Sequence, residues 1–362
     1  MYASPALASD GRALKFRPAP ADNGPAGVLR GPPERPNMRV VPPRPPTLPV
    51  LLLSGLLLAP LQVAAQADDP RDPDHRGWSY LVDKLVADGL DRSRVTLVFD
   101  DPHLPPFDGL EFSAAPRESH ALYRGFQRPA SIAAARRCRA AHADVLEAAE
   151  HGSGVPANVV AAILYVETAC GRNTGSSMIL HRLARLAMAN EPANLGDNLE
   201  RQGGAGECDT SLEERLRARA RYLEDTFYPE VRAAFDVADR LGVHPLSLRG
   251  SASGAIGTPQ FLPTNYLRFG TDGDRDGRVD LFDLGDAAAS CARYLSANGW
   301  RPGLAEKERR AVIWRYNHSD AYIDTVLTLA RRIGDGGTPA APPRKAPRPT
   351  HSPAKRGNRA RS

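Results

Sequence analysis

Apolar residues recur at helical spacing through most of the chain between residues 130 and 335, and strand-like alternation is almost absent there. An Ala-rich run free of Gly and Pro predicts a long helix over 131–150. Pro156 suits the first turn of a second helix, whose broad apolar face ends near Gly171. The body of the chain is therefore expected to be mainly α-helical. Further helices are predicted over 78–90, 177–189, 212–241, 284–298 and 309–333.

The segment from Val95 to Phe99 departs from that pattern. Its β-branched and aromatic residues favour a short strand, which Asp100, Asp101 and Pro102 would end. Residues 100–128 show no periodicity, so we expect an irregular connection there.

An apolar stretch over residues 48–63 is interrupted by Pro60 and is shorter than a membrane span requires, but it has the length of a signal-peptide core. Small residues at 65 and 67 and basic residues upstream complete that pattern and predict export with cleavage after Ala67. A start at Met38 gives a leader of ordinary length. A membrane-anchoring helix is the alternative. No Cys follows the stretch, so we expect no lipid anchor.

Composition adds that the core is globular and mildly acidic. Hydrophobic residues make up 42% and charged residues 25% of the chain, which excludes wholly disordered and multi-span membrane proteins. The formal net charge of +5 belongs to the ends: residues 1–67 carry seven Lys or Arg against three Asp or Glu, and residues 338–362 carry seven against none. The segment between them has a net charge of −6, so we expect no nucleic acid to bind the core. The basic tail is predicted to be disordered, and binding of anionic polymers is its alternative role.

Four cysteines become candidates for two disulfides once export is assumed. They allow three pairings, and the sequence does not choose among them. No CxxC pair, HExxH motif, P-loop or dinucleotide fingerprint occurs, which leaves zinc, redox and nucleotide chemistry without support. The four are Cys138, Cys170, Cys208 and Cys291.

The most specific motif is a 12-residue loop with the spacing of an EF-hand. Gly277 at position 6 permits the sharp turn, and the carbonyl of Arg278 at position 7 is a potential ligand. Asp283 stands where the typical loop has a bidentate Glu, which should weaken binding. A single loop suggests a structural Ca²⁺ or Na⁺ site, and a polar surface turn is the alternative. The side-chain oxygens at positions 1, 3, 5, 9 and 12 belong to Asp272, Asp274, Asp276, Asp280 and Asp283.

Glu167 is the candidate catalytic acid because it lies at the end of an apolar helix. Burial disfavours its charge, and so does the negative end of the helix dipole, so both effects raise its pKa toward the range that a general acid needs. A solvated residue at a helix end is the alternative.

The segment 250–266 mixes small residues with Gln260 and Phe261. The small residues would let the backbone approach a sugar closely, and the amide and aromatic side chains would offer contacts to it. A packed helix–loop corner is the alternative for this segment.

Five motifs occur in a fixed order along the chain. They are YVETACG around Glu167, GSASGAIGTPQFLPTNY over 250–266, the cation loop, Tyr294 ahead of Gly299 and Trp300, and RYNHSDAY over 315–322. In this order they resemble the lytic murein transglycosylase B family over roughly residues 120–335. The resemblance implies export, a lysozyme-like helical catalytic domain and an inserted EF-hand-like cation loop.

The activity that the resemblance implies is lytic cleavage of the β-1,4 bond between N-acetylmuramic acid and N-acetylglucosamine in peptidoglycan. One carboxyl would protonate the leaving oxygen and then deprotonate the muramoyl C6 hydroxyl, which closes a 1,6-anhydro ring. Glu167 matches that acid, and the chemistry needs no cofactor. Gln260 and Asn317 are expected to contact acetamido or hydroxyl groups, and the tyrosines to be sugar-stacking walls or acid-orienting groups. The positions that match the family's substrate cleft are Ser251, Gln260, Phe261, Tyr294, Tyr316, Asn317 and Tyr322.

The implied protein is a soluble, periplasmic monomer whose partners are peptidoglycan glycan strands. Three features depart from the family pattern. Cys170 stands where many relatives have an aromatic residue, and a Cys170–Cys208 disulfide is one pairing that would brace that loop. Pro259 replaces the usual Gly before Gln260, and 190–245 is longer and more charged than expected. The predicted organisation is an extension over 1–37, a signal peptide over 38–67, an accessory segment over 68–119, the catalytic domain over 120–335 and a basic Pro-rich tail over 336–362.

Two other functions stay open. A hydrolytic muramidase on the same scaffold would need a second carboxylate or a positioned water opposite Glu167, and Asp320 lies near the last motif without further support. A non-catalytic peptidoglycan-binding protein would keep the cation loop for stability alone, but the intact Glu167 and the intact cleft motifs speak against it.

Overall fold

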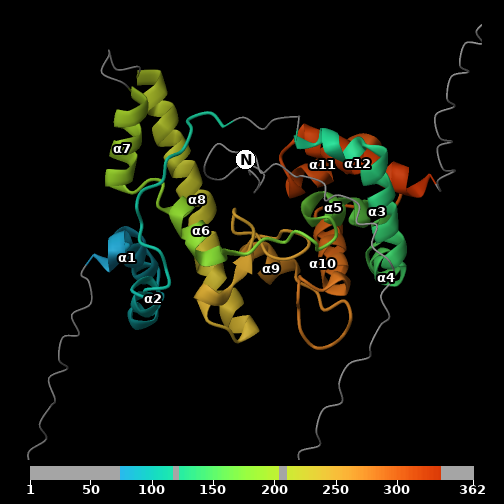
Figure 1. The fold of residues 1–362 in the computed structure, drawn as a ribbon, viewed down its shortest axis with the longest axis horizontal. Coiled ribbons are helices and arrows are strands. Elements are labelled where there is room, and N and C mark those ends of the chain that lie inside the picture. Colours follow the sequence, from blue (N-terminus) through green and yellow to red (C-terminus); the bar gives the residue numbers. More distant parts are fainter. Residues whose placement is uncertain (1–73, 117–121, 204–209, 336–362) are drawn as a thin grey trace, which may run out of the picture. The chain divides into compact units, whose positions relative to one another are not determined.

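Residues 74–116, 122–203 and 210–335 are described by the computed structural model. The predicted extension, signal peptide, Cys208 and basic tail lie outside the described residues. Helices make up nearly all of the regular structure (Figure 1), which confirms the mainly α-helical prediction. No helix in these three ranges is long and apolar enough to cross a membrane.

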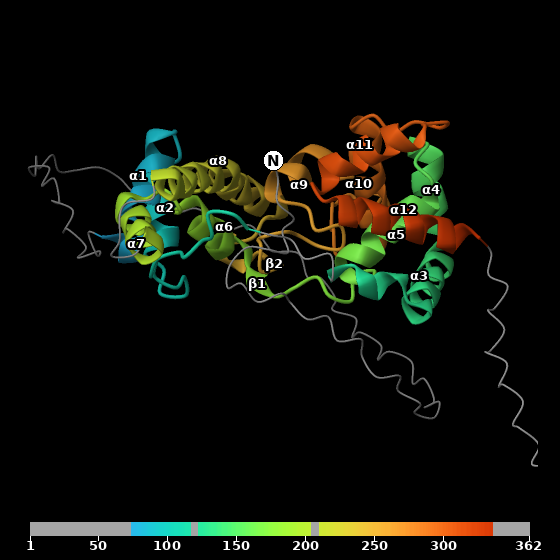
Figure 2. The ribbon, with the colours of Figure 1, turned by 90° about the horizontal axis from the view of Figure 1, so that it is seen from above.

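One group of helices is packed around α5 (Figure 2). Asn158 and Glu167 are the two residues of α5 that are not buried, so this helix is apolar on every side and requires neighbours all round. Helices α3, α4, α10 and α12 all pack against it, and α11 packs on α10 and α12. The elements of this group are η4 (Arg124–Gln127), α3 (Pro129–Ala141), α4 (Ala143–Ser153), α5 (Ala157–Thr168), α10 (Leu284–Ala297), α11 (Glu306–Tyr316) and α12 (Asp320–Gly334).

A second group is built on the long helix α8, against which α6, α7 and α9 pack. The buried residue Glu224 connects α8 to α1, because its carboxylate accepts hydrogen bonds from Tyr80 Oη at 2.7 Å and Lys84 Nζ at 2.5 Å. It also accepts one from Asn190 Nδ2 at 2.9 Å. The elements are η2 (His75–Gly77), α1 (Ser79–Ala87), α2 (Arg92–Phe99), β1 (Ser177–Met178), α6 (Ile179–Ala187), α7 (Pro192–Gly203), α8 (Thr210–Leu241), η5 (Pro245–Ser247), β2 (Arg249–Gly250) and α9 (Pro263–Phe269).

A single apolar core connects both groups. It extends from Trp78 before α1 to Ile333 in α12, and it contains side chains from α5, α6, α8 and α10. Residues 78–104 of the predicted accessory segment therefore share this core with the region that carries Glu167, whereas Leu110 and Phe112 pack in a second, smaller cluster.

The predicted strand over Val95–Phe99 is wrong, because these residues form most of helix α2. The Asp91 side chain accepts a hydrogen bond from the Arg94 N–H and caps the helix, and Val95, Val98 and Phe99 are buried at helical spacing. Capping and burial outweigh the β preference of the side chains.

Three predicted helices differ in extent from the observed ones. The helix over 131–150 is two helices, α3 and α4, which are separated at His142 by its non-helical backbone. The helix over 309–333 is likewise α11 and α12, because Asn317 is extended and the Ser319 side chain caps α12. The helix over 177–189 begins at Ile179, since the two residues before it form β1, which pairs antiparallel with β2.

Candidate active site

Glu167 is the last-but-one residue of α5, where the sequence places it. The helix ends after Thr168 because Ala169, Cys170 and Gly171 take positive φ angles of 52°, 58° and 78°. The N–H groups of Ala169 and Cys170 donate to carbonyls of the preceding turn, at Tyr165 and Leu164. Glu167 is thus held on the last turn of a rigid, buried helix.

Tyr322 holds the carboxyl of Glu167 from the facing helix. Its side chain is 1% exposed, and its hydroxyl donates a hydrogen bond of 2.6 Å to Glu167 Oε1. Oε1 accepts this bond, which leaves Oε2 free to carry the proton when Glu167 is neutral. The contact joins the C-terminal turn of α5 to the first turn of α12.

Burial raises the pKa of Glu167 to about 7, and the hydrogen bond from Tyr322 lowers it by a smaller amount. The residue keeps part of its surface open, but its carboxyl lies among enough protein atoms that loss of hydration dominates. The sequence argument from burial is confirmed in direction. Burial likewise raises the pKa of Tyr316 and Tyr322 well above the ordinary range, so both remain proton donors at neutral pH.

Aromatic rings form a packed layer behind Tyr322. The ring of Tyr316 stacks on that of Tyr322 with centroids 6.4 Å apart, and its hydroxyl donates to the Pro259 carbonyl at 2.5 Å. Tyr294 and Phe261 pack against Tyr316 with centroids 5.0 Å and 6.0 Å away. Phe261 and Tyr294 are buried, so they support this layer from inside instead of presenting a face to solvent.

Gln260 connects the loop after Glu167 to the glycine-rich segment. Its amide Nε2 donates to Thr174 O at 3.3 Å and to Gly257 O at 2.8 Å, and its own backbone is left-handed. Gly257 has to be glycine, because its φ is +67° and a Cβ would lie 2.4 Å from Leu281 O. The two catalytic-region motifs are therefore in contact, as a shared site requires.

The structure places Ser251 and Asn317 near the other site residues without showing a sugar contact. The hydroxyl of Ser251 accepts hydrogen bonds from the N–H groups of Ser253 and Ala255, which shapes the turn after β2. Asn317 is buried at the end of α11, next to Tyr316. Their predicted sugar contacts stay predictions.

The cation loop brings its first three acids together. The carboxylate oxygens of Asp272, Asp274 and Asp276 lie within 4.8 Å of one another. Asp272 also accepts N–H bonds from Asp276 and Gly277, and Gly277 takes a φ of +90°, as position 6 of an EF-hand requires. This donor set and turn fit a hard cation such as Ca²⁺.

Asp286 is a residue of this loop that the sequence argument missed. Its carboxylate is 2% exposed and accepts N–H bonds from Gly273 at 2.7 Å, Asp274 at 3.4 Å and Asp280 at 2.6 Å. It forms a second cluster with Asp274 and Asp283. Asp283 itself caps α10 through the N–H groups of Gly285 and Asp286, and the Asp-x-x-Asp spacing at the start of that helix is the signal that could have revealed Asp286.

The comparisons with known proteins agree with this geometry. The family described as "Transglycosylase SLT domain" matches residues 74–309, which is well over half of the chain. The chain belongs to the transglycosylase SLT domain family. The match begins before α1, so the family's domain includes most of the predicted accessory segment.

The membrane-bound lytic murein transglycosylase B of Escherichia coli K12 is 34% identical over 160 residues. This alignment covers 44% of the chain but only 36% of that relative, so the chain spans about a third of the relative's length.

Solved structures of the family share the fold. The soluble lytic transglycosylase SltB1 of Pseudomonas aeruginosa has a TM-score of 0.54 at 23% identity, over 72% of this chain and 98% of that one. The Escherichia coli lytic transglycosylase Slt35, solved in complex with calcium, has a TM-score of 0.51 at 22% identity, over 74% and 94%. Pseudomonas aeruginosa SltB3, solved with NAG-anhNAM-pentapeptide, has a TM-score of 0.51 at 20% identity, over 75% and 83%.

The observed disulfide differs from the Cys170–Cys208 pairing that we considered from the sequence. Cys170 is bonded to Cys138 of α3 and not to Cys208, and Cys291 is a free, buried thiol. Cys291 was not expected in the site, yet it lies within electrostatic reach of Glu167 and beside the hydroxyl of Tyr316. No motif marks it, because its position depends on how α10 packs against α5.

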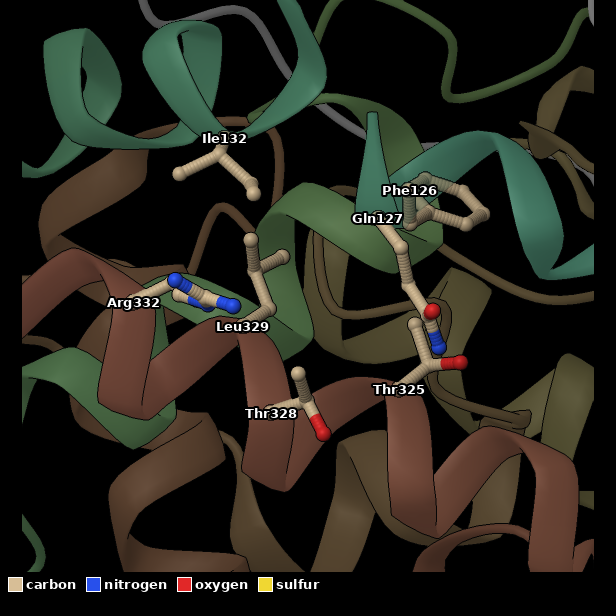
Figure 3. Close-up of a pocket in the computed structure, with 7 residues that line it drawn as sticks. All are labelled: Phe126, Gln127, Ile132, Thr325, Thr328, Leu329 and Arg332. Atoms are coloured by element: carbon tan, nitrogen blue, oxygen red, sulfur yellow. The ribbon is translucent and has the colours of Figure 1, made fainter. Parts of the chain in front are cut away.

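Two cavities lie beside the packed helices but away from the predicted site residues. The smaller, of about 90 Å³, is next to α12 (Figure 3), and the larger, of about 330 Å³, is at the opposite end of α5 from Glu167. Neither is lined by Glu167 or by a predicted substrate residue. The smaller one is lined by Phe126, Gln127, Ile132, Thr325, Thr328, Leu329 and Arg332.

Replacing Tyr322 by Phe should raise the pKa of Glu167 above about 7, because the hydrogen bond from its hydroxyl lowers that pKa. A hydrogen bond to a charged group contributes about 1.5 kcal/mol or more, so the change should be readily measured. The measurement is a pH titration of the Glu167 side-chain carbon by NMR in carbon-13-labelled protein. Tyr294→Phe is the matched control, because the Tyr294 hydroxyl donates to Arg315 O and the titration should not move. An unchanged titration in Tyr322→Phe contradicts the assignment.

Proposed function

We propose that the protein is a peptidoglycan lytic transglycosylase that cleaves the β-1,4 bond between N-acetylmuramic acid and N-acetylglucosamine and leaves a 1,6-anhydro ring. The observation that carries the proposal is the carboxyl of Glu167, whose pKa burial raises to about 7 and which Tyr322 orients. Membership of the transglycosylase SLT domain family supports the substrate class. The relative SltB3, solved with a ligand that contains an anhydro-muramic unit, supports the product.

In the first step Glu167 acts as the general acid. With a pKa of about 7, a large share of the molecules carries the proton at neutral pH. With Oε1 engaged by Tyr322, Oε2 is the oxygen that would hand its proton to the oxygen between the two sugars. Proton transfer to this leaving oxygen accompanies the breaking of its bond to C1 of the muramoyl unit.

In the second step the same group acts as the base. The Glu167 carboxylate is stabilised by the hydrogen bond from Tyr322, which is stronger to a charged acceptor than to a neutral one. It takes the proton from the C6 hydroxyl as that oxygen bonds to C1. The carboxyl returns to its starting protonation state, so one acid is sufficient and no water enters the product.

The muramidase alternative needs a second carboxylate or a positioned water opposite Glu167, and the described residues give a second carboxylate little support. Asp320 has a side chain that is 72% exposed and forms an ion pair of 2.9 Å with Arg310 on the neighbouring helix. The charge of Glu167 helps to raise the pKa of Cys291, Tyr316 and Tyr322, and these three groups near it are a thiol and two phenols. We therefore favour intramolecular attack by the C6 hydroxyl over attack by water.

The same proposal extends to the location and the cation site. The apolar stretch over 48–63 followed by Ala67 supports export to the periplasm, where peptidoglycan is the substrate. The carboxylate cluster at Asp272, Asp274 and Asp276 supports a structural Ca²⁺ ion, and the relative Slt35 was solved in complex with calcium. The chemistry itself uses only protein groups.

Incubating purified sacculi with the protein should release muropeptides that are lighter by one water and lack a reducing muramic end, as mass spectrometry would show. Glu167→Gln should lower the rate by about a thousandfold, because an amide cannot donate the proton and general acid–base catalysis typically contributes about 10²–10⁴-fold. Glu147→Gln is the matched control, since this carboxylate is exposed and pairs with Arg139. Hydrated reducing ends would point to the muramidase, and sacculus binding without products would point to the binding protein.

The pH profile follows from the raised pKa of Glu167. The first step needs the protonated acid, so kcat/KM on soluble glycan strands should be level below pH 7 and fall about tenfold per pH unit above it. An ordinary glutamate would give that decline from about pH 4.5. A decline that begins there would show that the acid is hydrated in solution and that burial does not set its pKa.

Calcium should raise the melting temperature by several degrees, because it relieves repulsion among the clustered carboxylates. Asp272→Ala combined with Asp276→Ala should remove that dependence, as differential scanning calorimetry with calcium and with chelator would measure. Asp83→Ala is the control, because that acid is exposed and distant in sequence from the loop. A wild-type melting temperature that ignores the chelator would refute the cation site.

A further inference from the structure

The disulfide joins α3 to the segment that ends the catalytic helix. Cys170 lies three residues after Glu167, and its partner Cys138 is near the end of α3. The two Cα atoms are 6.5 Å apart. The covalent link is therefore made at the turn that fixes where the acid stands.

The backbone of this turn is unfavourable for its residues. Ala169 and Cys170 are consecutive non-glycine residues with φ angles of 52° and 58°. L-residues rarely take this region, and such conformations persist only where the surrounding structure holds them. Without an external restraint, Ala169 and Cys170 would gain by leaving it, and the last turn of α5 would fray.

The hydrogen bonds of the turn are mostly internal to it. Ala169, Cys170 and Gly171 donate to Tyr165 O, Leu164 O and Thr168 Oγ1, all within the same stretch of chain. These bonds close the turn but do not fix it in space. Contacts to the glycine-rich segment come from Thr168 Oγ1 to Thr258 O at 3.0 Å and from Gln260.

Helix α3 is a suitable anchor because it also packs against α12, the helix that carries Tyr322. Helices α3, α5 and α12 thus contact one another in all three pairs (Figure 2). The bond from Cys170 to α3 fixes the end of α5 relative to α3 and α12, and so relative to Tyr322 on α12. The distance from Tyr322 Oη to Glu167 Oε1 depends on how these three helices are placed relative to one another.

We propose that the Cys138–Cys170 disulfide is a positioning brace for Glu167, so that its reduction lowers catalysis while the fold remains. The expected change in rate rests on the proposed function, whereas the expected change in the pKa of Glu167 does not. A dithiol reductant supplies two electrons and two protons, gives two cysteine thiols and is itself oxidised to a disulfide. Both cysteines are half-buried, so a small reductant can reach them, whereas Cys291 is fully buried.

The test compares the wild type with the Cys138→Ala/Cys170→Ala double variant. We expect kcat on soluble glycan strands to fall at least tenfold with KM within about twofold, since a small displacement of a catalytic group is costly. We also expect the pKa of Glu167, followed by carbon-13 NMR, to fall from about 7 toward the ordinary range of a glutamate. A frayed turn admits water, and the loss of burial outweighs the smaller, opposite effect of a weakened hydrogen bond from Tyr322. Adding dithiothreitol to the folded wild type should reproduce both changes, and reoxidation should reverse them.

Leu85→Ala is the matched control, because Leu85 is fully buried in α1 and its loss lowers stability without touching α5. Its melting temperature should fall while kcat and the titration of Glu167 stay at wild-type values. The brace is refuted if the double variant, or the reduced wild type where that variant does not fold, keeps both the rate and the pKa of Glu167. A wild type without activity on any glycan would refute the proposed function instead, and the titration would still decide the brace.

Discussion

The structure depends on one constraint: the apolar helix α5 must be buried, and it takes the carboxyl group of Glu167 into the interior with it. Every residue of α5 except Asn158 and Glu167 is buried, so neighbouring helices must surround it. The same packing removes water from Glu167 and raises its pKa to about 7. This has a cost for the fold: as pH rises from about 4.5 to about 7, the unfolded chain loses its proton before the folded one does, and stability declines.

The aromatic residues around this carboxyl act in layers. Tyr322 donates a hydrogen bond to Glu167, and the ring of Tyr316 stacks on that of Tyr322. Phe261 and Tyr294 pack against Tyr316, whose hydroxyl reaches the carbonyl of Pro259. A substitution at Phe261 or Tyr294 would thus alter the packing of Tyr316, which supports the ring that orients Glu167. The residues that the family resemblance assigns to sugar contact include several whose observed role is to hold the orienting tyrosine.

The sequence was informative wherever the evidence is local. Apolar spacing before Glu167 indicates burial of the helix, and burial indicates the direction of its pKa. The cation loop is also local, since its acids and Gly277 are fixed by spacing along a dozen residues. The strand predicted over Val95–Phe99 was wrong because the cap at Asp91 and burial in the core decide the conformation of this segment. The β preference of its side chains carries no information on either.

Features that depend on packing between distant segments could not be predicted. The pairing of Cys170 with Cys138 follows from α3 lying against α5, and spacing along the chain carries no information on that contact. The same holds for Cys291, which α10 brings next to the acid. Tyr322 could be matched to the family's cleft by its motif, but its distance from Glu167 required the arrangement of α12 on α5.

Asp286 has a consequence for how the acidic loop would take up an ion. Its carboxylate accepts hydrogen bonds from three backbone N–H groups, so contacts within the protein fix part of the loop's shape. A preorganised loop loses little conformational entropy on binding. Folding of this chain would then depend less on the ion than it does in small metal domains, in which coordination and folding are one event. The ion's contribution to stability would then depend on the free ion concentration around the folded protein.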